Sequence, residues 1–248
     1  MIRDTQFIAL VTGANRGIGL EIAHQLARSG AHVLLTGRDI AHARKAAETL
    51  AGEGLSITPL QLDVTDPVSI KNVADWIAEA FGALDILVNN AAIRIEDYGV
   101  APSEQPIGKW RETFETNLFG VVETTQALLP LIRKSPAGRI VNVSSLLGSV
   151  GTHSDRDSYA YSEMFKSLPA YSASKSGINS WTVHLAFELR NTPIKVNAVH
   201  PGYTKTDMND GAGDLEIPVG ARTSVEMALI GSDGPSGKYV HLDTILPW

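Results

Sequence analysis

The chain has 248 residues with 21 Lys and Arg against 27 Asp and Glu, a formal net charge of −6. This mild acidity argues against nucleic acid or an anionic membrane surface as the main partner. The absence of cysteine excludes disulfides and thiolate sites, and the 7 histidines lack metal-ligand spacing, so we expect no metal.

Apolar runs expected to be strands alternate along the chain with segments of helical periodicity. We expect strands at 7–11, 32–36, 57–62, 84–88, 139–143, 194–199 and 238–242. We expect helices at 20–27, 39–50, 66–81, 107–133 and 171–189, with a short one before the last strand. This alternation predicts an α/β fold with a doubly wound, mostly parallel sheet and helices on both faces, in one domain spanning 1–248.

Residues 1–6 contain no apolar signal core, and no apolar run is long enough to span a bilayer. The expected location is therefore the cytoplasm.

The turn between the first strand and the first helix contains Gly13, Gly17 and Gly19. A helix that begins there presents free backbone N–H groups and a positive dipole end to an anion. Glycines let the backbone approach a pyrophosphate without a clash at Cβ. The plainer alternative is a turn that only needs a positive φ.

Two further groups of residues suggest chemistry. Lys175 follows Tyr171 by four residues, so both side chains share a helix face, and a nearby ammonium lowers the pKa of a phenol. Ser144 and Ser145 follow the fifth strand at the sheet edge where α/β proteins bind ligands. Each group alone is also compatible with an ordinary helix pair or a capping serine.

Five motifs occur in order along nearly the whole chain. They are Thr12-Gly13-x-x-x-Gly17-x-Gly19, Asn89-Asn90-Ala91, the serine pair, Tyr171-x-x-x-Lys175 and Pro201-Gly202. In this order the chain resembles the short-chain dehydrogenase/reductase family. The resemblance implies a nicotinamide cofactor, hydride transfer and a seven-stranded Rossmann sheet.

The resemblance also implies roles for individual residues. Tyr171 is then the catalytic acid/base, Lys175 its tuner and ribose ligand, Ser145 the residue that orients the substrate, and Asn117 the holder of a proton-relay water. The implied cofactor contacts are Gly13, Asn15, Arg16, Gly17, Ile18, Gly19, Arg38, Asp63, Val64, Asn90, Tyr171, Lys175, Pro201, Gly202, Tyr203, Thr204 and Thr206.

The sequence departs from the common family pattern at three places. Ala92 replaces the usual glycine after Asn-Asn-Ala, Tyr171 lies unusually far beyond Ser145, and the chain end lacks the usual Gly-Gly. The last two features, with Thr206-Asp207-Met208, resemble the NADPH-dependent carbonyl reductase branch. We expect substrate specificity to reside in an insertion at 148–168 and a loop at 201–219, whose sequences name no substrate.

Arg38 ends the second strand, and with Arg16 it favours the 2′-phosphate of NADPH over the free hydroxyl of NADH. Asp39 follows and is expected to cap the next helix. The expected function is reduction of a ketone or aldehyde. Oxidation of a secondary alcohol, a sugar-nucleotide epimerase or dehydratase, and a non-catalytic NADP(H)-binding regulator remain alternatives.

The expected partner is a small carbonyl or alcohol substrate. We expect a monomer or homodimer rather than a tetramer. The 148–168 insertion precedes a helix through which many relatives assemble, and in relatives with longer insertions it covers that helix.

Overall fold

The protein is described by a computed structural model of residues 6–248, so most of the N-terminal segment judged to lack a signal core lies outside the described residues. Its sheet has the order β3-β2-β1-β4-β5-β6-β7-β8. The strands are β1 (Ile8–Val11), β2 (His32–Gly37), β3 (Ile57–Gln61), β4 (Ile86–Asn89), β5 (Arg139–Val143), β6 (Lys195–Val199), β7 (Tyr239–His241) and β8 (Thr244–Ile245). The first seven are parallel, as expected. The eighth strand corrects the expected seven, because the chain folds back after β7 and pairs antiparallel to it.

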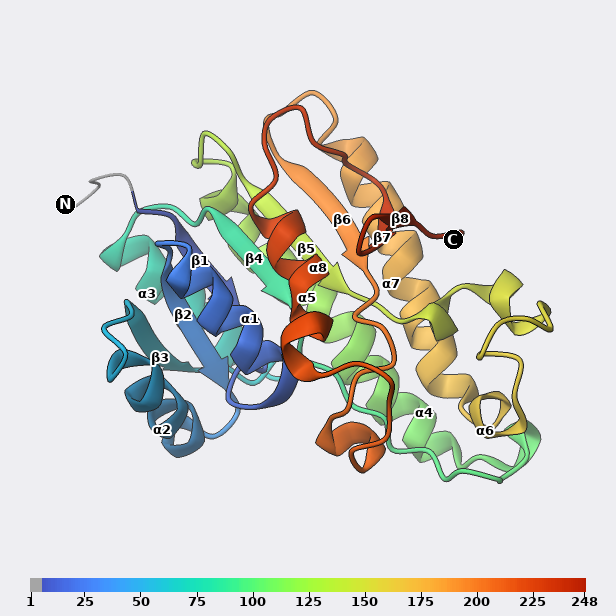
Figure 1. Ribbon diagram of the computed structural model, residues 1–248. Helices are drawn as coiled ribbons and strands as arrows, with labels where there is room; N and C mark the ends of the chain where they lie inside the picture. Colours follow the sequence, from blue (N-terminus) through green and yellow to red (C-terminus); the bar gives the residue numbers. More distant parts are fainter. Residues whose placement is uncertain (1–5) are drawn as a thin grey trace.

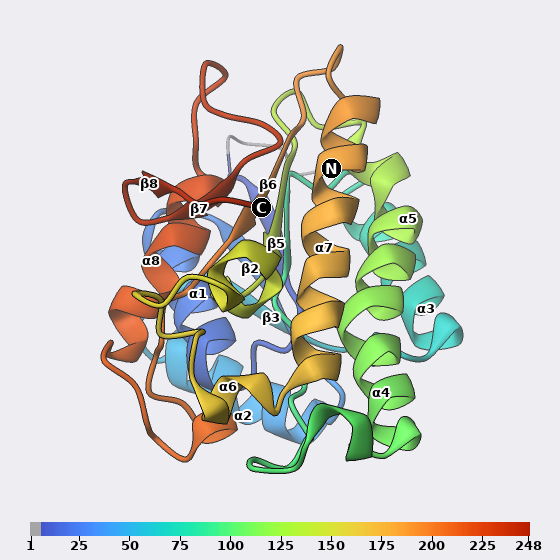
Figure 2. The same ribbon diagram turned by 90° about the vertical axis from the view of Figure 1, so that its right-hand side faces the viewer.

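The helices cover both faces of the sheet (Figure 1). They are α1 (Gly17–Arg28), α2 (Ile40–Ala51), α3 (Pro67–Ala80), α4 (Ile107–Phe114), α5 (Gly120–Ile132), α6 (Glu163–Lys166), α7 (Pro169–Glu188) and α8 (Ile217–Ala228). In Figure 2, α1, α2 and α8 lie on one side of the strands, and α3, α5 and α7 on the other. The expected helix at 107–133 is interrupted by a π-helical turn over Glu115–Phe119.

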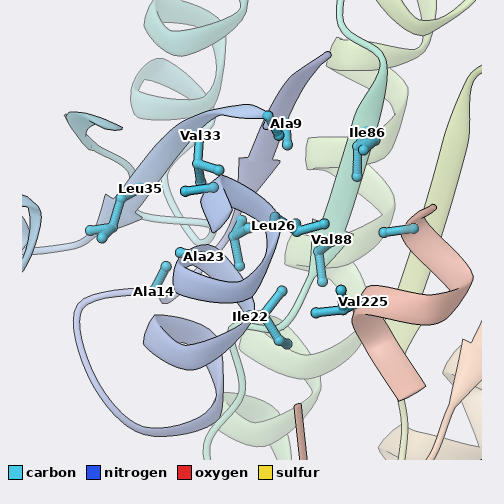
Figure 3. Packing of buried hydrophobic residues seen from close by; sticks show 14 of the residues in the cluster. Ala9, Ala14, Ile22, Ala23, Leu26, Val33, Leu35, Ile86, Val88 and Val225 are labelled. Carbon is cyan, nitrogen blue, oxygen red and sulfur yellow. The ribbon is translucent and has the colours of Figure 1, made fainter. Parts of the chain in front are cut away.

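Apolar stripes on the helices fix them to the sheet. Ile22 and Leu26 of α1 pack with Val88 of β4 and Val225 of α8, and all four are buried (Figure 3). Fully burying one such side chain contributes about 1.5–3 kcal/mol. This packing fixes α1 at an angle that points its first turn at the carboxyl edge of the strands.

The chain runs outward from β1 in both directions, to β2 on one side and to β4 on the other. In open α/β sheets such a switch point opens a crevice beyond the carboxyl ends of the strands. The glycine turn after β1 and the segments after β4, β5 and β6 all reach this edge. The predicted functional residues are therefore gathered by topology.

The 148–168 segment consists of short 3₁₀ turns and α6, and it lies beside the start of α7 at the carboxyl edge (Figure 2). Farther along α7, Val183 and Phe187 are exposed. The oligomeric state stays a prediction. Within residues 6–248, no helix is long and apolar enough to cross a membrane.

Candidate active site

Two clefts meet at the carboxyl edge of the sheet. The first, the tyrosine cleft, encloses about 780 Å³ including its open mouth, and Tyr171 and Lys175 lie on its wall. The second, the glycine cleft, runs along the turn after β1. Both are lined by Ile18, Asn90, Ala92, Thr206 and Met208. A ligand lying in the glycine cleft can therefore extend one end into the tyrosine cleft.

The structure brings together every sequence-predicted site residue except Asn117. The glycine cleft is lined by Gly13, Asn15, Arg16, Gly17, Ile18, Gly19, Arg38, Asp63, Val64, Asn90 and Thr206. The tyrosine cleft is lined by Ser145, Tyr171, Lys175, Pro201, Gly202, Tyr203, Thr204 and Thr206.

The glycine turn has the geometry of an anion cradle. Gly17 has a φ of +57°, a left-handed conformation that favours glycine. A Cβ there would meet nothing within 4 Å, so the backbone conformation rather than a lack of space requires glycine. A Cβ at Gly19 would lie 2.4 Å from Nδ2 of Asn90, so the residue is fixed by close approach. No side chain caps the N-terminus of α1 within the described chain, which leaves its first N–H groups for a ligand.

Thr12 and Asn90 hold the cradle from behind. The Thr12 hydroxyl accepts the backbone N–H groups of Asn90 and Ala91, each at 2.9 Å. The Asn90 amide donates to the carbonyl oxygens of Thr12 at 3.0 Å and Gly13 at 3.2 Å. The end of β4 is thereby fixed to the glycine turn.

Charged side chains are arranged at the far end of the glycine cleft. The Asp39 carboxylate accepts the backbone N–H of Ala41 at 2.7 Å, so it caps α2, as expected. This leaves Arg38 as the charged residue at the end of β2 that faces the cleft. Arg16 pairs with Asp207 at 3.3 Å, but both side chains are mostly exposed, so the pair contributes little to stability.

The predicted catalytic group converges in the tyrosine cleft. Ser145 follows β5, while Tyr171 and Lys175 lie on the first turns of α7. The Lys175 ammonium donates to the Val143 carbonyl at 2.7 Å, and it lies 5.7 Å from the centroid of the Tyr171 ring. A Cβ at Gly148 would lie 2.8 Å from the Lys175 carbonyl carbon, so glycine permits the Ser145 turn to approach α7.

Burial governs the pKa values of the tyrosine and the lysine. Burial raises the pKa of Tyr171 to about 12, and a hydrogen bond from Ser145 opposes this by favouring the phenolate. Burial also lowers the pKa of Lys175 to about 8. The tyrosine therefore carries its proton at neutral pH, because desolvation outweighs the opposing Ser145 hydrogen bond and the charge of Arg94. The expected tuning of this pKa by Lys175 stays a prediction.

Asn117 is fully buried outside both clefts, in the π-helical turn. Its side chain accepts the N–H of Ile93 at 2.8 Å and donates to the carbonyl of the same residue at 2.9 Å. It also donates to the Ser174 hydroxyl, which in turn donates to the Tyr171 carbonyl. Asn117 thus joins the loop after β4 to the helix that carries the tyrosine.

The family model described as short chain dehydrogenase matches residues 7–216. The chain belongs to the short-chain dehydrogenase family. Short-chain dehydrogenase/reductase 1 of Saponaria officinalis is 37% identical, with 97% of this chain and 95% of that protein covered. Carbonyl reductase (NADPH) 3 of Mus musculus is 34% identical, with 97% and 98% covered. The solved structure of NADPH-bound carbonyl reductase from chicken fatty liver superposes with a TM-score of 0.82 at 27% identity, covering 98% of this chain and 99% of that one.

In this short-chain dehydrogenase, sequence reasoning missed a buried carboxylate. Glu96, in the loop after β4, accepts the backbone N–H groups of Ala170 at 2.6 Å and Tyr171 at 3.0 Å. It therefore caps the first turn of α7 from 75 residues away in the chain. Burial raises the pKa of this carboxyl. A capping role across such a separation leaves no local sequence pattern.

Other wall residues of the tyrosine cleft were also missed, namely Arg94, Tyr159, Phe165 and His200, while Tyr98 was expected in a loop near the site but without a role. His200 stands directly before the recognised Pro201-Gly202 pair, which was a usable signal. Tyr159 and Phe165 belong to the 148–168 insertion. We expected this insertion to contribute to substrate specificity, but the sequence did not indicate which of its residues would do so.

Proposed function

We propose that this family member reduces a ketone or aldehyde carbonyl with hydride from NADPH. The main support for this proposal is that the two clefts share a boundary. The uncapped N-terminus of α1 lies in one cleft, and the other is lined by Ser145, Tyr171 and Lys175. The carbonyl reductase relatives named above support both the reaction and the cofactor.

The residues present fit NADPH. The cradle of the glycine turn suits the pyrophosphate, and Asp63 and Val64 line the wall proposed for adenine. We assign the 2′-phosphate to Arg16 and Arg38, because guanidinium groups bind phosphate in charge-assisted pairs. The weak exposed pair of Arg16 with Asp207 leaves that guanidinium accessible.

The remaining cofactor positions follow from the tyrosine cleft. We assign the nicotinamide end to the wall formed by 201–206 and the ribose to Lys175. When bound, NADPH supplies the hydride to the carbonyl carbon.

The chain's own residues supply the proton and stabilise the developing charge. Ser145 and Tyr171 donate hydrogen bonds to the substrate carbonyl oxygen, where negative charge develops. Tyr171 then gives its phenolic proton to that oxygen as general acid. Asn117 acts as a positioning residue through Ser174, and its expected part in a proton-relay water chain stays a prediction.

The protonated form of the tyrosine is the one that carbonyl reduction needs. A phenol with a pKa of about 12 carries its proton at neutral pH and can donate it, as reduction requires. Alcohol oxidation would require the phenolate.

We further propose that residues 1–248 act as one catalytic unit, with 148–168 and 201–219 shaping the substrate site. The cytoplasmic location remains a prediction from the sequence.

The decisive experiment follows loss of nicotinamide absorbance with a panel of ketones, aldehydes and quinones and each reduced cofactor. Tyr171→Phe should lower kcat by about 10²–10⁴-fold, because it removes the general acid but keeps the ring. NADPH affinity should stay near that of the unaltered protein. Near-native turnover by purified Tyr171→Phe would refute the mechanism and favour a cofactor-binding regulator.

A further inference from the structure

The insertion contributes Tyr159 to the tyrosine cleft, which Tyr98, Tyr171 and Tyr203 also line. Tyr159 lines the same cleft as Tyr171, and its hydroxyl lies 3.2 Å from Nε2 of His200. Its ring is stacked on Tyr203 at 6.0 Å between centroids and meets Phe165 edge-on at 5.3 Å. These contacts hold the phenol in one orientation on an otherwise aromatic wall.

The backbone determines which nitrogen of His200 carries the proton. The N–H of Leu146 donates to Nδ1 of His200 at 3.2 Å. A backbone N–H can only donate, so Nδ1 must present its lone pair. His200 is 4% exposed, and burial together with His241 lowers its pKa to about 3, which keeps the ring neutral. The single proton of the neutral ring therefore lies on Nε2.

This tautomer also sets the role of the Tyr159 hydroxyl. Nε2–H of His200 donates to the phenolic oxygen, so the phenol is the acceptor in that bond. The phenolic O–H must then donate elsewhere, and His200 is its one hydrogen-bond partner among residues 6–248. Tyr159 is 37% exposed and lines the cleft, so a substrate that enters the cleft can supply the acceptor that this O–H lacks.

We propose that Tyr159 is a specificity-determining residue that donates a hydrogen bond to a second acceptor on the substrate. The inference rests on the proposed carbonyl reduction and narrows its substrate class. That class is a ketone with a flat apolar body, which contacts Phe165 and Tyr203, and a further ether, hydroxyl or carbonyl oxygen. Tyr171 and Ser145 donate hydrogen bonds to the reacting carbonyl oxygen, and Tyr159 donates one to the second oxygen.

The test compares ketones that differ by one atom. The substrates are 1-tetralone, which lacks a second acceptor, and its ring-oxygen analogues 4-chromanone and isochroman-4-one, which place the oxygen at two positions. The protein is assayed with NADPH as the unaltered chain and as Tyr159→Phe. The control is Tyr161→Phe, because Tyr161 lies in the same insertion but does not line the cleft.

Tyr159→Phe should lower kcat/KM for at least one ring-oxygen ketone by about 2- to 12-fold, the range for one lost hydrogen bond. The value for 1-tetralone should change less than about 2-fold, below that range, and the control should leave all three near their original values. An equal loss for all three ketones would indicate a merely structural residue and overturn the proposal. No loss for any of them would also overturn it.

Two further measurements distinguish a failure of the Tyr159 proposal from a failure of the proposed carbonyl reduction. If the unaltered protein reduces none of the ketones, carbonyl reduction fails, and affinities of the same compounds for the NADP⁺-loaded variants then decide the role of Tyr159. The ¹⁵N spectrum of His200, assigned by its loss in His200→Asn, should show a proton on Nε2 and none on Nδ1. A proton on Nδ1 would overturn the inference whatever the kinetics show.

Discussion

The most direct test of the scaffold is Thr12→Val. Valine has nearly the shape of threonine, so the substitution removes the hydroxyl and little else. In the structure that hydroxyl accepts the N–H groups of Asn90 and Ala91, both at 2.9 Å. No other acceptor for these two groups lies within residues 6–248. The substitution therefore leaves two donors without partners at the junction of the clefts.

The expected cost can be worked out from these two bonds. Each hydrogen bond contributes about 0.5–1.5 kcal/mol net, so the free energy of unfolding should fall by about 1–3 kcal/mol. For a chain of this length, 1 kcal/mol corresponds to about 2–4 °C in Tm. NADPH affinity should fall as well, because the same contacts fix the glycine turn.

Chemical denaturation and calorimetry measure the stability, and titration with NADPH measures the affinity. Thr12→Ser is the matched control, because it keeps the hydroxyl and loses only a methyl group. If Thr12→Val were as stable as Thr12→Ser and bound NADPH as tightly as the unaltered protein, the assigned role of the hydroxyl would be wrong.

Three further outcomes are expected. Arg38→Asp should reduce the preference for NADPH over NADH in kcat/KM by at least about 10-fold, since bonds to charged groups contribute about 1.5–3 kcal/mol, and an unchanged ratio would contradict the phosphate assignment. Between pH 8 and 10.5 the unfolded chain holds a proton on Lys175 that the folded chain releases. The unaltered protein should therefore gain about 3 kcal/mol of stability relative to Lys175→Met across that window, in urea titrations at several pH values, and a flat difference would disprove the lowered pKa. Gly148→Ala should lose about 1–3 kcal/mol and much of kcat by displacing the Ser145 turn from α7, whereas Gly151→Ala, with open space around its Cβ, should not.

Much of the fold was predictable because local signals and burial agree. The buried strand β1 is a continuous apolar run, and β4 is apolar up to its last residue, Asn89. Asp39 and Asp66 cap the helices that they precede. β8 was not predictable, because a strand of two exposed residues has no apolar pattern and exists only through pairing with β7.

The candidate site was predictable where its residues are neighbours in sequence or follow strands. Gly17, Ser145 and Lys175 are of this kind. Glu96 and Tyr159 are not, because their contacts join segments far apart in the chain. The raised pKa of Tyr171 was also beyond sequence reasoning, since spacing places Lys175 nearby but does not reveal how deeply the phenol is buried.

The π-helical turn at Glu115–Phe119 has a consequence for engineering. It inserts one residue's worth of rotation, about 100°, between α4 and α5. A helical wheel drawn without a break from 107 to 132 therefore assigns the residues beyond the turn to the wrong side. Deleting one residue there would make the helix regular, but it would rotate α5 relative to α4. Either Leu128 and Ile132 of α5 would then turn away from the sheet, or Trp110 and Phe114 of α4 would turn away from their present positions. Circular permutation or loop grafting should treat 107–132 as two helices of fixed relative phase.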